Sequence, residues 1–405
     1  MVRPELLIPA GNLEKLRTAV LYGADAVYVG IEGLSLRAAQ AEFSLADLEQ
    51  GIREAHRAGV KVYGAINTFA RNSDLPKIAA AVERLAILGI DAVIVSDPGV
   101  VQLIRKINPK LPLHLSTQAN TTNQEAVRFW KTQGVSRVVL ARELTLAEIA
   151  EVAAAVPEVE VELFIHGAMC VAYSGRCFLS AHRNRRSANR GDCTQPCRWE
   201  YAIHESTRPN DPILMETDSH YTYLLNSKDL CMIAYLPEVL RAGVTSLKVE
   251  GRMKSAYYVA LVTRTYRQAI DAYLRDPGNY RCQPEWLAEL EKTSHRGYTT
   301  GFYFSSEMIR ETTPERKYTK THDLVGTVLE YHPATQQMLV GVRNRLAVGD
   351  EVDLLLPDGI LPVDLTQMND VDGIPVQIAH NSYQVSLPAP APVPVGAVLR
   401  RKMVD

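Results

Sequence analysis

The chain has 405 residues, of which 46% are hydrophobic and 22% are charged. Lys and Arg number 44 against 46 Asp and Glu, so the net charge of −2 excludes a globally basic nucleic-acid-binding protein. No run approaches the ~18 apolar residues of a membrane span, and the start MVRPELLIPAGNLEKL lacks the apolar core of a signal peptide. We therefore expect a cytoplasmic protein with no membrane partner, built from two or three domains of about 150 residues or from one barrel with an appendage.

One pattern recurs through the first part of the chain: a helical stretch ends in Gly, and an apolar, β-branched run follows. Gly is the usual residue after a helix end because it adopts positive φ without a steric penalty. Runs that are apolar at every residue, rather than at alternate ones, indicate strands covered on both faces, as in a parallel sheet. Eight such strands lie within residues 6–11, 22–30, 57–67, 88–97, 113–120, 133–143, 161–167 and 241–252.

Eight strand–helix units favour an α/β fold, a (β/α)8 TIM-type barrel over residues 1–300. An open doubly wound sheet has the same periodicity, but no G-x-G-x-x-G follows a strand. A barrel brings its strand ends to one mouth, where its active site lies, although strand ends are also where any chain becomes polar again. Polar residues at or just past the strand ends are Asn12, Asn67, Ser96, Asp97, Gln118, Asn120, Arg142, Glu143, His166, Glu250 and Arg252.

The connection after the seventh strand is much longer than the others. It covers about residues 168–245 and should overhang the mouth of the barrel. An amphipathic helix over residues 255–276 closes the barrel, and residues 301–322 form a polar, Tyr-rich linker. From residue 323 to residue 405, short strands alternate with turn residues and predict a small all-β, barrel-like domain.

Four of the six cysteines lie in the long connection: Cys170, Cys177, Cys193 and Cys197. We expect no disulfides, because the compartment is reducing and the chain is large. Four thiolates can hold a zinc ion or an iron–sulfur cluster, and the C-x6-C-x15-C-x3-C spacing favours the larger cluster, with four unrelated cysteines as a third interpretation. Cys231, in the helical stretch NSKDLCMI, and Cys282 should be dispensable.

Arginines surround these cysteines. The stretch from Arg176 to Arg198 contains six arginines and one aspartate, a local charge of +5. Guanidinium groups would stabilise an anionic cluster and would attract phosphates, and a solvated basic loop is the plain alternative. Arg176 and Arg198 adjoin cysteines and are expected beside the cluster. Three mid-loop arginines are expected to face solvent and a polyanion: Arg183, Arg185 and Arg186.

Several long motifs resemble one known family. LHLSTQAN (113–120), HGAMCVAYSGRCFLS (166–180), GDCTQPCRWEY (191–201) and SLKVEGRMKS (246–255) are similar to motifs of the collagenase-like U-series peptidase family. The likeness runs over essentially the whole chain. HRGYTTGF (295–302) and the appended β domain are most similar to the branch of that family that acts in tRNA hydroxylation.

The resemblance implies an iron–sulfur-dependent, oxygen-independent RNA hydroxylase. It implies a [4Fe–4S] cluster on the four clustered cysteines, which match the cluster cysteines of the family, and it leaves Cys231 as a spare. It also implies that the substrate is the anticodon loop of tRNA, whose wobble uridine becomes 5-hydroxyuridine with prephenate as co-substrate. Proteins that deliver electrons or clusters are implied partners.

The division of roles among the site residues follows from this resemblance. A base in an anticodon loop can be splayed into a pocket, so Gln118 and Asn120 are assigned to the uracil edge and the mid-loop arginines to phosphates. Whether the cluster supplies an electron or binds the oxygen donor stays open. The catalytic candidates at the mouth are Glu143, His166, Glu250 and Arg252.

Other classes of function fit the same sequence. A collagenase-like peptidase would match the family's older name, although no H-E-x-x-H or G-x-S-x-G motif supports a protease. A non-catalytic RNA-binding protein would use its metal structurally, and sister branches of the family hydroxylate ribosomal RNA or quinone precursors. A brown colour of anaerobically purified protein would separate an iron–sulfur cluster from zinc.

Overall fold

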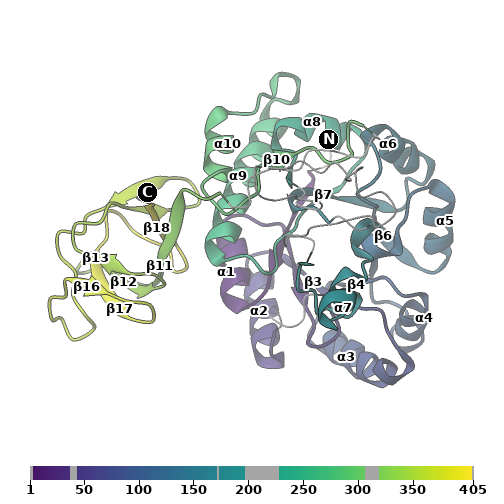
Figure 1. Ribbon diagram of the computed structural model, residues 1–405, viewed down its shortest axis with the longest axis horizontal. Coiled ribbons are helices and arrows are strands. Elements are labelled where there is room, and N and C mark those ends of the chain that lie inside the picture. Colours follow the sequence, from purple (N-terminus) through teal and green to yellow (C-terminus); the bar gives the residue numbers. More distant parts are fainter. Residues whose placement is uncertain (1–2, 37–42, 171–172, 197–227, 306–318, 404–405) are drawn as a thin grey trace, which may run out of the picture.

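The structure is a computed structural model that describes residues 3–36, 43–170, 173–196, 228–305 and 319–403. A barrel surrounded by helices forms its larger part, and a β domain lies beside it (Figure 1). Strand β9 pairs with both β7 and β1, which closes the barrel. The eight parallel barrel strands are β1 (Glu5–Ala10), β2 (Ala26–Gly30), β3 (Lys61–Ile66), β4 (Ala92–Val95), β5 (Leu113–Leu115), β6 (Val135–Val139), β7 (Glu160–Ala168) and β9 (Ser246–Val249). The predicted (β/α)8 barrel is thereby confirmed.

Several helices around the barrel begin with a polar side chain as their N-terminal cap. Asn12 accepts a hydrogen bond from the backbone N–H of Lys15, and Asp97 accepts one from that of Val100. Both residues were expected at the mouth, but their side chains are occupied as helix caps. The helices are α1 (Leu13–Leu21), α2 (Leu45–Arg57), α3 (Leu75–Ile87), α4 (Pro98–Ile107), α5 (Gln124–Thr132), α6 (Leu146–Ala155), α8 (Leu236–Arg241), α9 (Ala256–Arg275) and α10 (Pro284–Leu290).

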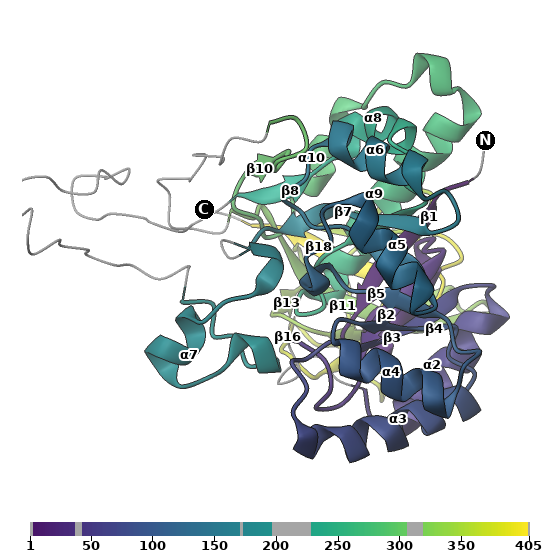
Figure 2. The same cartoon turned by 90° about the vertical axis from the view of Figure 1, so that its right-hand side faces the viewer.

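The long connection after β7 leaves the barrel and returns to it. Its described first part contains the single-turn helices η4 (Tyr173–Gly175) and η5 (Ala188–Arg190) and the helix α7 (Leu179–Asn184). Helix α7 stands out from the barrel on one side (Figure 2). The chain rejoins the sheet at β8 (Asp229–Cys231). The insertion was expected to cover about residues 168–245, but β8 and α8 in the last part of that range already belong to the barrel.

Strand β8 corrects one prediction. The stretch around Cys231 was expected to be helical, but it runs antiparallel to the end of β7, with Cys231 opposite His166. The short strand β10 (Tyr298–Thr299) then pairs with β8. Pairing with segments distant in the sequence overrides the local helical pattern here.

The C-terminal domain is antiparallel throughout, which confirms the predicted all-β domain. Its six-stranded sheet has the order β15-β14-β18-β11-β12-β17, and β13 and β16 form a separate pair. Its strands are β11 (His322–His332), β12 (Gln337–Val342), β13 (Leu346–Ala347), β14 (Val352–Leu355), β15 (Ile360–Val363), β16 (Ile378–Ala379), β17 (Gln384–Pro388) and β18 (Val398–Lys402). Among the helices of the described residues, none is long and apolar enough to span a bilayer.

Buried polar contacts join the two domains. Arg400 on β18 is only 1% exposed, and its Nη1 lies 2.7 Å from Glu289 Oε2 on α10. The hydroxyl of Tyr22 donates to the carbonyl of Leu355 at 2.6 Å and accepts from the N–H of Val398 at 3.2 Å. These contacts fix the β domain against α10 and the end of α1.

We predict that Arg400→Met lowers the free energy of unfolding by about 3 kcal/mol, because the largely buried Glu289 then loses its buried cationic partner and keeps only the ion pair with the more exposed Lys292. Urea unfolding at neutral pH measures the loss. Arg343→Met, which breaks the exposed ion pair with Glu14 at the same domain boundary, should cost less than about 1 kcal/mol. Equal losses in the two variants would contradict the assignment of Arg400 as the main contact.

The same pair predicts a pH dependence. Burial raises the pKa of Glu289, but hydrogen bonds from Arg400 and Lys292 outweigh burial and leave the pKa below its ordinary value of 4.5. A carboxylate with a lowered pKa contributes stability above the unfolded value and loses it as the pH falls through the folded value. The difference between wild type and Arg400→Met should therefore shrink as the pH falls below 4.5.

Candidate functional site

A cavity of about 150 Å³ opens at the carboxyl ends of the barrel strands. Interior residues of β2, β3, β4, β6, β7 and β9 form part of its lining, and the long connection after β7 forms the rest. Three cysteines of that connection contribute to the lining: Cys170, Cys177 and Cys193. Pro196 also lines the cavity, and Cys197, the next residue, lies outside the described residues.

Two of the three described thiols of this loop receive backbone hydrogen bonds. The N–H of Leu179 donates to Cys177 Sγ at 3.3 Å, and the N–H of Gln195 donates to Cys193 Sγ at 3.4 Å. Donors of this kind stabilise a thiolate. Within the described ranges, no three His, Cys, Asp or Glu side chains lie close enough together to hold one metal ion.

Glu143 holds the cysteine loop to the end of β6. Its carboxylate accepts hydrogen bonds from both the N–H and the hydroxyl of Ser174, each at 2.6 Å. Ser174 is buried and has a left-handed backbone, φ 41, a conformation that costs free energy for a residue other than Gly. The bonds to the carboxylate offset that cost. Glu143, expected as a catalytic candidate, is thus placed as an anchor for the stretch between Cys170 and Cys177.

Further contacts fix the loop at other points of the barrel rim. Arg176 Nε donates to the carbonyl of Gln118 at 2.9 Å, which places this arginine across the end of β5. The side chain of Asn189 accepts from the N–H of Cys177 at 3.1 Å, and its carbonyl accepts from the N–H of Phe69 at 3.0 Å. The loop is therefore tied to the ends of β3, β5 and β6.

Lys248, which the sequence analysis did not assign to the site, lies in the lining of the cavity. It is buried, its Nζ lies 2.6 Å from Glu162 Oε1, and it stands 4.6 Å from the centre of the Tyr28 ring. Burial lowers the pKa of Lys248, and Glu162 opposes that shift. The sequence contained a signal for this residue. Lys248 in SLKV and Glu162 in VEVELF are opposite charges within largely apolar barrel strands, and such charges are expected to pair when they are buried.

Gln118, Glu250 and Arg252, which were expected at the mouth, line the cavity. Gln118 is buried, and its Nε2 has no hydrogen-bond partner among the described residues. Arg252 donates to Ser35 Oγ at 3.1 Å and also holds the loop after β2. Asn120 lies just beyond the lining and adopts a left-handed backbone at the end of the η3 turn (Thr117–Ala119).

His166 has a different environment from the one expected of a catalytic residue. It is buried between the rings of Tyr258, Tyr266 and Tyr298, at centroid distances of 5.4 to 6.0 Å, and does not line the cavity. Burial lowers the pKa of His166 to about 3. The imidazole is therefore neutral at physiological pH and packs as an aromatic side chain.

The mid-loop arginines are exposed on and just after α7. Arg186 forms an ion pair with Asp192 across the surface of the loop, with its Nε 2.8 Å from the carboxylate. Arg185 has a left-handed backbone at the end of α7. These three arginines therefore lie outside the lining of the cavity to which the cysteines contribute.

We predict that Glu143→Ala loosens the cysteine loop without unfolding the barrel. The variant loses two hydrogen bonds to a charged acceptor, each contributing roughly 1.5–3 kcal/mol, and leaves the left-handed Ser174 unsupported. Amide hydrogen exchange should rise around Ser174 and stay unchanged in the barrel strands. Glu151→Ala, an exposed change on α6, is the control. Unaltered exchange at Ser174 in the Glu143 variant would show that the loop does not depend on this anchor.

Comparison with known proteins places this site in a family. The chain matches "Peptidase family U32" over residues 11–313 and "Peptidase family U32 C-terminal domain" over residues 320–400. The tRNA hydroxylation protein P1 of Bacillus subtilis (strain 168) is 42% identical over 357 residues, which are 88% of this chain and 84% of the relative. The tRNA hydroxylation protein P of Escherichia coli (strain K12) is 38% identical and covers 96% of this chain and 94% of the relative.

A third relative is named for a related modification of ribosomal RNA. The 23S rRNA 5-hydroxycytidine synthase of Escherichia coli (strain K12) is 36% identical over 360 residues, which are 87% of this chain and 53% of that protein. The match to the family covers both the barrel and the β domain. This chain is a member of peptidase family U32 and carries the C-terminal domain of that family.

Proposed function

We propose that this protein is an RNA hydroxylase that uses an iron–sulfur cluster and acts on tRNA without molecular oxygen. The observation that carries the proposal is the group of three free cysteines around one cavity at the barrel mouth. Relatives named for hydroxylation of tRNA and ribosomal RNA, at 36% to 42% identity, support the choice of reaction and of substrate class.

The residues that would hold the cluster are Cys170, Cys177, Cys193 and Cys197. A [4Fe–4S] cluster bound there would supply one-electron chemistry or a Lewis-acidic iron. Zinc is the alternative, but the C-x6-C-x15-C-x3-C spacing of the four cysteines in the sequence favours a larger body. Hydrogen bonds from the N–H groups of Leu179 and Gln195 would tune the potential of such a cluster.

The cavity suits a single nucleobase rather than a folded RNA. A base must leave its stack to enter a cavity of this size, and extrusion is least costly in a single-stranded loop. The free Nε2 of Gln118 can donate to a carbonyl oxygen on the edge of a pyrimidine. Tyr28 and Phe164 supply apolar lining, and Lys248 and Arg252 supply positive charge.

The resemblance to the tRNA hydroxylation branch extends the proposal to a specific product. The substrate would be the wobble uridine of the anticodon loop, the product 5-hydroxyuridine, and prephenate the co-substrate. Reduction and assembly of the cluster would require cytoplasmic partner proteins. Hydrolysis of collagen-like peptides is the competing function, and the family's peptidase description is what favours it.

We predict that deleting the gene in its host abolishes 5-hydroxyuridine and its derivatives in bulk tRNA. Mass spectrometry of tRNA nucleosides makes the measurement, with ribosomal RNA analysed in parallel. Re-expression of the wild type should restore the nucleoside, and re-expression of Cys177→Ser should not. Unchanged tRNA nucleosides would exclude the proposed substrate. Loss of a modified nucleoside from ribosomal RNA alone would favour a ribosomal RNA substrate, and hydrolysis of gelatin by the purified protein would favour a peptidase.

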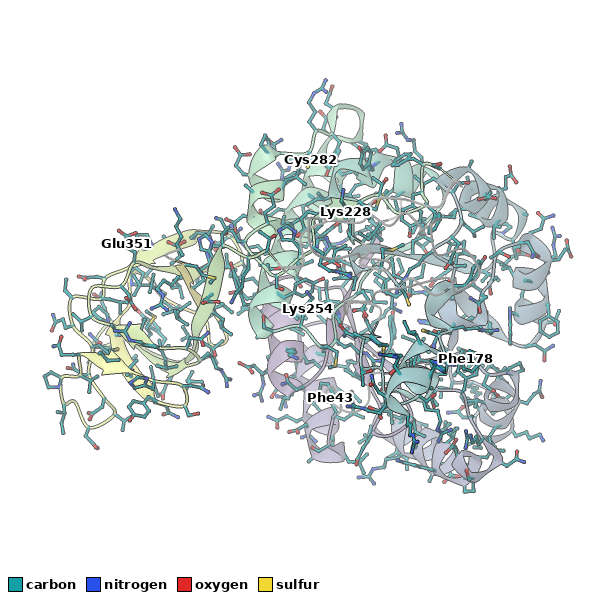
Figure 3. The ribbon with its side chains drawn as sticks, viewed as in Figure 1. Phe43, Phe178, Lys228, Lys254, Cys282 and Glu351 are labelled. Carbon is teal, nitrogen blue, oxygen red and sulfur yellow. The ribbon has the colours of Figure 1, made fainter. Side chains whose placement is uncertain are left out.

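We also predict that each of the four clustered cysteines is required for bound iron and Cys231 and Cys282 are not. Cys231 is buried, and burial raises its pKa to about 11, which disfavours the thiolate needed for iron. Cys282 lies beside α10, apart from α7 (Figure 3). Iron content and visible absorption of anaerobically purified Cys→Ser variants test this. Loss of iron in Cys231→Ser would instead make Cys231 a ligand.

A further inference from the structure

Two exposed aromatic side chains belong to the loop that lines the cavity. Phe178 is 81% exposed, the largest exposed fraction among the large hydrophobic side chains of the described ranges, and Tyr173 is 52% exposed. Their chain neighbours Ser174, Cys177 and Leu179 line the cavity. Phe178 follows Cys177 directly and marks the start of α7 (Figure 3). The loop thus presents cavity-lining residues and exposed rings in alternation.

Packing within the described part of the chain does not explain the exposure of Phe178. The ring follows the cysteine and precedes Leu179, and both of those side chains face the cavity. Loss of a phenyl ring from such a position should change the fold very little, because the ring gains little from burial. A flat apolar ring held in solvent beside a site is suited to contact with a ligand.

The charge around these rings indicates the chemistry of that ligand. Arg183, Arg185 and Arg186 are exposed on the same short segment, and Asp192 pairs with Arg186. Aromatic rings interleaved with arginines match single-stranded nucleic acid, whose bases stack on the rings while its phosphates pair with guanidinium groups. An apolar protein segment would not benefit from the arginines.

We propose that Phe178 and Tyr173 form a stacking platform for the unpaired nucleotides next to the base that enters the cavity. The proposal rests on the proposed function, since it takes RNA as the substrate. A base stacked on Phe178 would lie one residue away from Cys177 and Leu179, so the following nucleotide would be presented at the cavity entrance. The mid-loop arginines would hold the phosphates on the outer side of α7.

Binding of an anticodon stem-loop RNA to the intact protein tests the platform. Phe178→Ala should weaken binding about tenfold, in line with the loss of one base–aromatic stack. Phe178→Trp should retain binding, and Phe178→Leu, which keeps an apolar side chain but loses the flat ring, should not. Phe129→Ala removes another exposed phenyl ring, 54% exposed on α5 away from the mouth, and should leave binding unchanged.

The dependence of binding on salt separates stacking from charge. Phe178→Ala should leave the slope of log affinity against log salt unaltered, because it removes no phosphate contact. Changing Arg183, Arg185 and Arg186 together to Gln should flatten the slope by about two, at roughly 0.7 per phosphate on a single strand. A matched triple change of the exposed Arg53, Arg84 and Arg128 on α2, α3 and α5 should leave it as it is.

The failure of this inference is distinguishable from failure of the proposed function. Wild-type protein that binds no tRNA stem-loop would overturn both. Wild-type binding with an equal affinity for Phe178→Ala would overturn the platform alone. A lower melting temperature and lower iron content in Phe178→Ala, with no selective loss of RNA binding, would show that the ring packs on the protein's own chain and would likewise overturn it.

Discussion

A buried group of charges inside the barrel fixes the arrangement on which the candidate site depends. Glu162 is fully buried, with Lys248 Nζ 2.6 Å and Arg137 Nη1 3.3 Å from its carboxylate, and Arg137 in turn binds Glu5. These four residues come from β7, β9, β6 and β1. A buried charge left without its partner costs several kcal/mol. The charges therefore pair only when β1 and β7, on the two sides of β9, are both in the observed register with it. The same register places Lys248 in the wall of the cavity.

The two ends of the barrel therefore have different roles. The interior behind the cavity is filled by the charge network and by Tyr63, whose hydroxyl donates to Glu5 at 2.6 Å. At the other end the strand ends carry Gln118, Glu250 and Arg252 and a loop tied to the rim at several points. Barrels commonly place chemistry on the loops at this end and stability at the other. Here the loop is held by hydrogen bonds from its own backbone, at Ser174 and Cys177, which is how a segment without a core of its own can hold three thiols around one space.

The sequence predicted the elements well and the directions of side chains poorly. Helices that end in Gly and strands that are apolar at every residue are local signals, so the barrel and the β domain followed from them. Whether the side chain of a polar residue just past a strand end faces the cavity depends on the local backbone conformation and on the hydrogen-bond partners nearby. Asp97 caps α4, Glu143 binds the cysteine loop and His166 packs among tyrosines, although all three occupy equivalent places in the sequence pattern. Cys231 was placed in a helix because its partner strand lies some sixty residues earlier in the chain.

In the cysteine loop, the residues proposed for RNA recognition are adjacent in the chain to those proposed for chemistry. Cys177 and Leu179 line the cavity, while Phe178 between them points to solvent. The backbone N–H of Leu179 binds the thiol of Cys177, and the N–H of Cys177 binds Asn189, so the backbone that carries the ring is fixed on both sides. Phe178 and Cys177 are adjacent on this fixed stretch of backbone. A ligand stacked on Phe178 would therefore have a defined position relative to the Cys177 thiol. Such placement reduces the entropy that must be lost before reaction. Because Glu143 anchors the same loop through Ser174, the position of the exposed rings and that of the thiols depend on one set of contacts, and a change there would move both together.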